Sequence, residues 1–476
     1  MTHPPQPLDA LESGNYFAKR RKIYSRSVTG RYRRLKWMVM AVTLAIYYLA
    51  PLLRWDRGDH APDQAILIDL NHARAYWFFI EIWPQEVYYL TAILVFAAIS
   101  LFFVTSLFGR VWCGYFCPQT VWTDLFVHVE YLIQGDRGAR KRLDDGPWTA
   151  EKIWKKLTTH FIWLLIALVT GGAFVFYFND APTLWHQILT GNVSPMVLMF
   201  VGGLTFSTYL MAGFAREQVC IYMCPYSRFQ SAMFDADTLI IAYDPARGEP
   251  RGKAKGGDDR RFGDCIDCSA CVQVCPMGID IRNGLQIDCI ACGLCVDACN
   301  DIMDKVSKPK GLIRYDSERN MDMKGTQAHL QARFFRPRTF YYATLLILVA
   351  GVVLYQLVTR APFELHVLQD RNPLFVQLSD GRVRNGYELH LLNKTHDAQR
   401  FRVTVEGIED AEIQYADSTA ATEGITVAPD AVTKLHLFVK ARPADHNQST
   451  IRFVFNNMED KNKISAESQF VHGGQR

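Results

Sequence analysis

The stretch Cys265-Ile-Asp-Cys268-Ser-Ala-Cys271-Val-Gln-Val-Cys275-Pro276 decides how this chain is interpreted, because its pattern returns as Cys289-Ile-Ala-Cys292-Gly-Leu-Cys295-Val-Asp-Ala-Cys299-Asn300. Each run separates four cysteines by two, two and three residues. Thiolates are soft ligands, and four of them at short intervals are typical of iron–sulfur and zinc sites. The duplication therefore predicts one unit that holds two similar metal centres.

The spacing of the two runs favours [4Fe-4S] clusters. It is the spacing of the bacterial ferredoxin run, in which three thiolates hold one cluster and the fourth ligates the other cluster. Two zinc sites are the alternative, but zinc sites usually have well-separated cysteine pairs or histidines, and no histidine lies between Cys265 and Cys299. Such a unit transfers single electrons. The predicted ligands are Cys265, Cys268, Cys271 and Cys299 for the first cluster, and Cys289, Cys292, Cys295 and Cys275 for the second.

Apolar stretches outside this unit predict a membrane protein. The chain has 476 residues, of which 49% are hydrophobic. A helix needs about 20 apolar residues to cross a bilayer, and five stretches are long and apolar enough. They are residues 37–53, 87–109, 157–178, 194–214 and 340–358.

The distribution of Lys and Arg predicts the orientation of these spans. Residues 19–36 carry nine Lys and Arg, whereas residues 179–193 carry none. Basic loops stay preferentially in the cytoplasm, so the N-terminus and the ferredoxin-like unit are expected inside and everything after residue 359 outside. All twelve cysteines fall on the expected reducing side. Next to a span, the basic arm is expected to contact lipid rather than nucleic acid.

The exported tail has a different pattern. Seven short alternating runs between residues 363 and 455 predict an antiparallel sandwich of immunoglobulin-like size. The tail has no cysteine, and its histidines are scattered along the chain without ligand spacing. A docking module and a stabilising cap remain alternative roles. The histidines are His366, His390, His396, His436 and His446.

Four further cysteines form a second repeat. Cys113-Gly-Tyr-Phe-Cys117-Pro118 follows the second span, and Cys220-Ile-Tyr-Met-Cys224-Pro225 follows the fourth. Cysteines at i and i+4 share one face of a helix, and the proline ends that helix or begins the next. Both spans run in the same direction, so the four thiols are expected to converge. Copper binding, another cluster, disulfide cycling and a purely structural role are the alternatives.

Two arginines precede these CxxxCP motifs. Arg110 and Arg216 stand at similar distances before the first cysteine of each motif. Either residue can lower the pKa of the thiols or attract anions. Anchoring of the span at the membrane surface is an equally good explanation.

The whole arrangement resembles the cytochrome c oxidase accessory protein family of the CcoG, FixG and RdxA type. The resemblance covers nearly the whole chain. It implies a bacterial inner-membrane protein with two [4Fe-4S] clusters and an immunoglobulin-like periplasmic domain, which supports assembly of cbb3-type cytochrome c oxidase by reducing Cu(II) to Cu(I). The residues that carry it are Arg110–Asp124, Cys220–Arg228, the two ferredoxin runs, Asp370–Asn372 and Asn385–Tyr387.

The expected fold is therefore a five-helix α transmembrane bundle with a cytoplasmic two-cluster ferredoxin-like insert and a C-terminal all-β immunoglobulin-like sandwich. The expected activity is that of a cupric reductase with Cys113, Cys117, Cys220 and Cys224 at its copper site. A quinol-to-periplasm electron conduit and a non-redox assembly scaffold are the alternatives. Expected partners are the inner membrane, a copper transporter or chaperone, oxidase assembly components and an electron donor; self-association is left open. The expected boundaries are 1–36 (basic arm), 37–257 (membrane region), 258–310 (ferredoxin-like), 311–339 (linker), 340–358 (fifth span) and 359–476 (sandwich).

Overall fold

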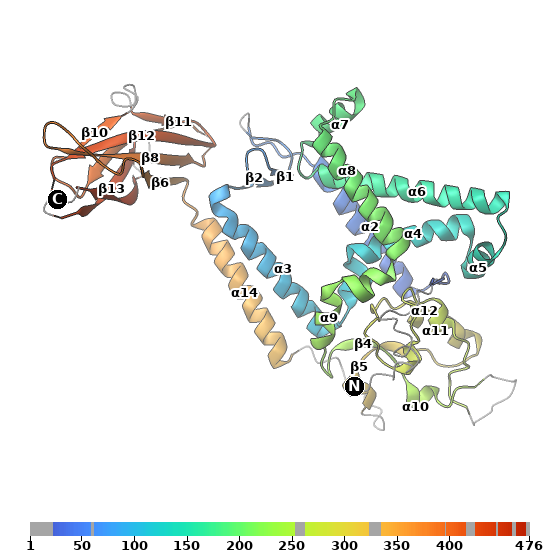
Figure 1. The fold of residues 1–476 in the computed structure, drawn as a ribbon. Coiled ribbons are helices and arrows are strands. Elements are labelled where there is room, and N and C mark those ends of the chain that lie inside the picture. Colours follow the sequence, from blue (N-terminus) through green and yellow to red (C-terminus); the bar gives the residue numbers. More distant parts are fainter. Residues whose placement is uncertain are drawn as a thin grey trace, which may run out of the picture. The chain divides into compact units, whose positions relative to one another are not determined.

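The computed structural model describes residues 22–58, 61–252, 262–322, 335–395, 397–415, 424–443, 446–458 and 463–472 (Figure 1). Residues 1–21 of the expected basic arm, 323–334 of the expected linker and His396 lie outside this description. The chain forms two compact units, and each is described by itself. The first unit is Met1–Leu53 with Gln64–Gly351, and the second is Arg54–Asp63 with Val352–Arg476.

Five helices are long and apolar enough to cross a membrane, which confirms that part of the expected fold. Two of them continue as a different kind of helix. The third begins at Ala150, earlier than expected, because the Thr149 side chain accepts a hydrogen bond from the Lys152 backbone and caps its first turn. The helices are α2 (Arg31–Leu49, continued by the 3-10 turn Ala50–Leu52), α3 (Val87–Phe108), α6 (Ala150–Val175), α8 (Pro195–Thr208, continued by the π-helix Tyr209–Ala215) and α14 (Pro337–Val358).

The connections between the spans are more ordered than the sequence indicated. A three-stranded antiparallel sheet separates α2 from α3, and a short helix separates α6 from α8. Three more helices follow the CxxxCP motifs. These elements are β1 (Ile66–Asp69), β2 (Arg74–Trp77), β3 (Ile80–Ile82), α4 (Pro118–Gln134), α5 (Arg137–Asp145), α7 (Ala181–Thr190) and α9 (Pro225–Ala232).

The cysteine-rich unit extends beyond both of its expected boundaries. Strand β4 (Leu239–Tyr243) pairs antiparallel with β5 (Ile313–Ser317), so the expected linker contains a strand of this unit. The error arose because β5 is short and has Arg, Tyr and Asp at its centre, which hide its buried end residues Ile313 and Ser317. Between the strands lie α10 (Pro245–Gly248), α11 (Ala270–Gln273) and α12 (Leu294–Lys305), and α13 (Glu318–Asp322) follows β5.

The C-terminal unit is a sandwich of two antiparallel sheets. One sheet has the order β10-β12-β8-β6 with β7 paired to β8, and the other has the order β11-β9-β13-β14. Fully buried aromatic side chains such as Tyr387, Phe401 and Phe453 form the core between them. Strands β11 and β14 were not expected, because β11 is short and β14 carries polar residues at most positions. The strands are β6 (Phe363–Gln369), β7 (Val376–Gln377), β8 (Val383–Asn393), β9 (Gln399–Glu406), β10 (Glu412–Tyr415), β11 (Ile425–Val427), β12 (Ala431–Ala441), β13 (Gln448–Asn457) and β14 (Lys463–Val471).

Candidate iron–sulfur and thiol site

The two ferredoxin runs fold in the same way. In the first run, Asp267 and Ser269 flank Cys268 with φ values of 53° and 54°. In the second run, Ala291 and Gly293 flank Cys292 with φ values of 51° and 75°. Left-handed backbone is rare outside glycine and is frequent where a loop closes around a site. Each run thus curls around its own centre before a helix, α11 or α12, begins.

These curled loops leave two small cavities, one bordered by four thiols and the other by five. The fourth thiol of each set comes from the opposite run, in the crossed arrangement that the spacing predicts. Cys271 borders both cavities. One cavity is bordered by Cys265, Cys268, Cys271 and Cys299. The other is bordered by Cys275, Cys289, Cys292 and Cys295.

The donor sets fit [4Fe-4S] clusters. No His, Asp or Glu among the described residues borders either cavity, and the rest of the second lining is Ile and Met. Within the described ranges, no three donor side chains converge closely enough to hold a single metal ion. Burial raises the pKa of the Cys299 thiol to about 12. This thiol therefore stays protonated at neutral pH until a metal displaces the proton.

Each CxxxCP motif forms one turn of π-helix, which corrects the expectation of an ordinary helical face. The Cys117 N–H donates to the Trp112 carbonyl at 2.9 Å, and the Cys224 N–H donates to the Val219 carbonyl at 2.8 Å. The proline that follows is the first residue of α4 or α9. Proline suits this position because the N–H that it lacks would have no partner within the helix. Cys117 and Cys224, the second cysteines of the two motifs, therefore each stand directly before a new helix.

The structure brings the two motifs together, although they lie more than a hundred residues apart in the chain. The pKa of Cys113 is raised to about 12, first by burial and then by the nearby thiols Cys117, Cys220 and Cys224. The Cys220 pKa is also raised to about 12, by burial and then by Cys117 and Cys224. Cys113 and Cys220 therefore each lie within electrostatic reach of Cys117 and Cys224.

The first motif packs directly on the loop of the second ferredoxin run. A Cβ atom added to Gly114 would lie 2.6 Å from the Ile290 carbonyl oxygen, so only glycine fits there. The Tyr115 hydroxyl donates to the Cys292 carbonyl at 3.0 Å. Cys113 and Cys220 pack in one apolar cluster with Ile290 and Cys292. Two of the membrane thiols thus contact a cluster whose members Ile290 and Cys292 also border the second cavity.

The two candidate arginines have different roles. Arg110 is buried, donates to the Ser227 carbonyl at 2.5 Å and to the Ile287 carbonyl, and its charge acts on Cys113, Cys220 and Cys289. It opposes the rise in thiol pKa, but burial outweighs it. Arg216 instead donates to the Glu130 carboxylate at 2.7 Å. Of these two arginines, Arg110 is therefore the one that bonds to both α9 and the loop of the second ferredoxin run.

Contacts from the N-terminal part of the chain fix the ferredoxin-like unit to the first span. The Asp297 carboxylate on α12 accepts hydrogen bonds from the backbone N–H groups of Tyr32, at 3.2 Å, and Arg33, at 2.8 Å. These groups lie in the first turn of α2 and have no partner within that helix. Sequence reasoning missed this cap, because an aspartate within a helix gives no sign of a distant partner.

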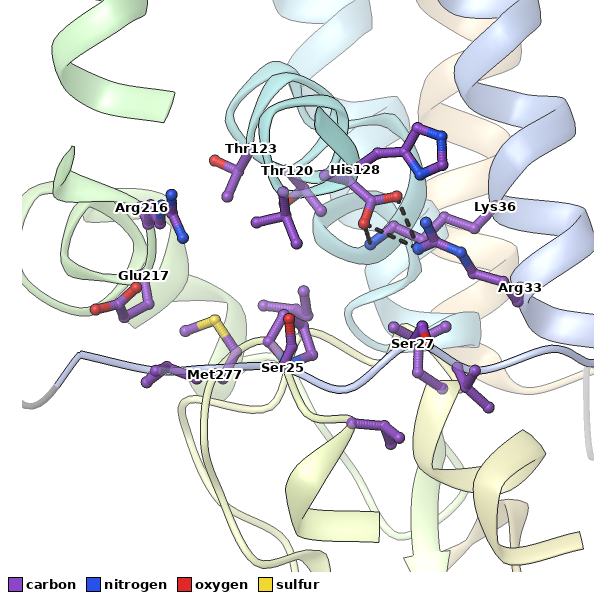
Figure 2. Close-up of a pocket in the computed structure, with 18 of the residues that line it drawn as sticks. Ser25, Ser27, Arg33, Lys36, Thr120, Thr123, His128, Arg216, Glu217 and Met277 are labelled. Carbon is purple, nitrogen blue, oxygen red and sulfur yellow. Dashed lines mark hydrogen bonds and ion pairs between the residues drawn. The ribbon is translucent and has the colours of Figure 1, made fainter. Parts of the chain in front are cut away.

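A cavity of about 220 Å³ lies between this N-terminal segment, α2, α4 and the loops beside the second cavity. Figure 2 shows Arg33, Lys36 and His128 on one side and Arg216 and Glu217 on the other. Arg33 and Lys36 share the Asp124 carboxylate at 2.9 Å and 3.7 Å, and they hold the Asp124 pKa below its usual range although burial raises it. Cys220 also borders the cavity.

These features define a class: a multi-pass membrane protein that carries an iron–sulfur electron-transfer unit. Known families match three parts of the chain, described as a 4Fe-4S binding domain (residues 89–139), a 4Fe-4S dicluster domain (residues 215–318) and an IG-like fold at the C-terminus of FixG, a putative oxidoreductase (residues 353–473).

Curated relatives match over most of their length. The chain is 48% identical to the nitrogen fixation protein FixG of Rhizobium meliloti, over 90% of this chain and 87% of that protein. It is 46% identical to protein RdxB of Cereibacter sphaeroides, over 94% of both chains, and 48% identical to protein RdxA of the same organism, over 89% and 90%. The chain belongs to the FixG family of membrane-bound ferredoxins.

Proposed function

We propose that this iron–sulfur protein reduces Cu(II) to Cu(I) for the assembly of a cbb3-type cytochrome c oxidase. The observation that carries the proposal is the direct packing of Gly114 and Tyr115 on the loop of Cys289 and Cys292. In support of it, Cys113 and Cys220 pack in the same apolar cluster as Cys292, which borders one of the two cysteine-lined cavities. Soft thiolates favour Cu(I) over Cu(II), so a copper substrate held there is stabilised in its reduced form.

The proposed roles of the residues follow from their positions. A bound [4Fe-4S] cluster supplies one-electron exchange. The crossed cysteine sets would hold the two clusters, and Ile241, Ile279 and Ile290 would keep water from the second one. Arg110 holds the membrane motifs and the second loop together through two backbone carbonyls. Cys113, Cys117, Cys220 and Cys224 receive the copper ion.

The proposed topology has the N-terminus and the ferredoxin-like unit in the cytoplasm and the sandwich in the periplasm. The excess of Lys and Arg in the loops on one side of the spans supports it. Alkaline phosphatase fusions after residues 193 and 360 are expected to be active, and fusions after residues 145 and 310 inactive. The reverse pattern would overturn the topology.

Replacement of all four CxxxCP cysteines by serine tests the copper site. The variant, purified anaerobically and reduced with dithionite, is expected to keep about eight irons per chain and to lose copper reduction. About twelve irons in the unaltered protein would instead indicate a third cluster at these thiols. Unchanged copper reduction by the variant would exclude these thiols, and loss of oxidase assembly without loss of copper reduction would favour a scaffold role.

The cavity of Figure 2 favours a second candidate function, oxidation of a membrane quinol. Its cations Arg33, Lys36 and Arg216 are held in ion pairs, and apolar side chains such as Val274, Met277 and Leu294 border it, so a ring with polar substituents fits. Residues beside the second cluster ligands, such as Pro276 and Ile290, form one wall. Thr123→Trp is expected to block reduction of the clusters by a short-chain quinol but not by dithionite. Equal reduction of both proteins by the quinol would remove this candidate.

A further inference from the structure

Three histidines of the C-terminal sandwich lie on one face of one sheet. The strand register places His366 on β6 opposite His390 on β8, and Glu388 on β8 opposite His436 on β12. Alternate residues on these strands face the core, as the full burial of Leu389 and Leu437 shows. His366, Glu388, His390 and His436 therefore all face outward.

This convergence is invisible in the sequence. The three histidines are spread over seventy residues and none shares a motif with another. The pairing of β6 and β12 on either side of β8 gathers them. Directly opposed residues have Cβ atoms about 4.5–5.5 Å apart, and alternate residues on one strand lie on the same face. The four side chains thus form a patch two residues long and three strands wide.

Carboxylates beside the three histidines give this patch charges that favour a bound cation. His390 Nε2 lies 2.9 Å from a Glu388 carboxylate oxygen, and His436 Nε2 lies 3.0 Å from an oxygen of Asp370. His366 Nε2 lies 3.6 Å from an oxygen of Glu364. The three carboxylates outnumber the two lysines that contact them, Lys394 and Lys434. Metal-binding histidines commonly bond a carboxylate in this way through the second ring nitrogen.

We propose that this face binds one Cu(II) ion, or a similar borderline divalent cation, through imidazoles of His366, His390 and His436 and the Glu388 carboxylate. A nitrogen-rich set with one oxygen suits Cu(II), which also binds most tightly among the divalent first-row metals. The side chains of His366, His390 and His436 are 50%, 22% and 40% exposed, so their rings have room to rotate. In the described residues no three donors yet converge, and binding exchanges the His–Glu388 bond for metal ligation.

This site is independent of the proposed copper reduction at the membrane thiols. The test uses full-length protein in detergent, in the background where Cys113, Cys117, Cys220 and Cys224 are serine, titrated anaerobically with Cu(II) after oxidation of its clusters. Paramagnetic resonance is expected to show one Cu(II) per chain with nitrogen couplings from at least two imidazoles. Failure of copper reduction in the unaltered protein would leave this result unaffected.

Paired variants make the test decisive. The double variant His366→Ala with His390→Ala is expected to remove the nitrogen couplings. Asp370→Asn removes the carboxylate bonded to His436, and it is expected to weaken copper binding about tenfold. His446→Gln, at an exposed histidine away from the patch, is the control and should bind as before. His390→Gln with His436→Gln repeats the test should the first pair unfold, as judged by thermal melting. Unchanged nitrogen couplings in either folded double variant would overturn the proposal.

Discussion

The two CxxxCP motifs have the same backbone but different surroundings. In each motif the residue four positions before the first cysteine has a left-handed backbone, with φ values of 58° at Gly109 and 45° at Arg216. In both motifs a π-turn follows, and then a helix that begins at a proline. The first motif is covered by the second ferredoxin loop, and Tyr115 is only 3% exposed. In the second motif the equivalent Tyr222 is 53% exposed. Local sequence fixes the turn, whereas tertiary contacts decide how deeply the tyrosine of each motif is buried.

Different interactions stabilise the same left-handed residue in the two motifs. At Gly109 an added Cβ atom would lie 2.7 Å from the Leu239 carbonyl oxygen, so β4 itself requires a glycine. Arg216 takes this conformation with a full side chain, and its guanidinium is fixed by Glu130 and by the Gly213 carbonyl at 2.8 Å. The first motif therefore depends on close packing and the second on a buried ion network.

Loss of this ion network is expected to have the largest effect. Glu130 binds both Arg140 and Arg216 at 2.7 Å, and all three side chains are buried. Glu130→Gln leaves two buried guanidinium groups without their charge partner, which is expected to destabilise the protein by about 3–5 kcal/mol. Thermal melting in detergent measures this, with the exposed pair variant Glu151→Gln as control. A melting temperature equal to that of the control would contradict the role of the network.

The same carboxylate predicts a pH dependence. Burial raises the pKa of Glu130, but Arg216 and Arg140 hold it below its usual range in the folded protein. The ion pairs of Glu130 therefore stabilise the protein fully at pH values above the pKa of this residue in the unfolded chain, about 4.3. This stabilisation is lost as the pH falls through the lower pKa of Glu130 in the folded protein. Melting of the unaltered protein should fall with acidification below pH 5, and less steeply in Glu130→Gln. Parallel curves would show that other groups cause the decline.

A larger residue at position 114 tests the close packing of the first motif on the second ferredoxin loop. Gly114→Val pushes against the Ile290 and Ala291 carbonyl groups and is expected to destabilise the protein by about 1–3 kcal/mol. Copper reduction by dithionite-reduced protein should fall further than stability, because the thiols and the second loop separate. Ile221→Val, at the equivalent position of the second motif, is the matched control. Equal rates in both variants would show that contact with the loop is unimportant.

A smaller effect is expected from one hydroxyl group. Tyr115→Phe removes the bond to the Cys292 carbonyl and should cost about 1 kcal/mol. Tyr222→Phe should cost less, because its ring is half exposed. Chemical denaturation followed by cluster absorption distinguishes them, and an equal loss in both variants would contradict the difference between the motifs.

Much of the architecture was predictable, because some features depend only on local sequence. Hydropathy identified the five apolar helices, and the repeated cysteine spacing indicated an iron–sulfur unit, because each run sets three thiols within a few residues of one another. The pairing of β4 with β5, the Asp297 cap and the histidine patch were not predictable, because each joins residues that are far apart in the chain. The π-turns were missed because an i, i+4 cysteine pair fits an ordinary helix equally well.

The Asp297 cap links cofactor maturation to the anchoring of the first span. Helix α12 carries Cys295, Asp297 and Cys299, so thiol ligation and the capping of α2 depend on the same twelve-residue helix. Metal sites of this kind commonly order their helices only when loaded. A chain made under iron starvation is thus expected to expose its N-terminal arm to trypsin near Arg26 and Arg31. Its susceptibility to protease would then report whether the clusters have been inserted.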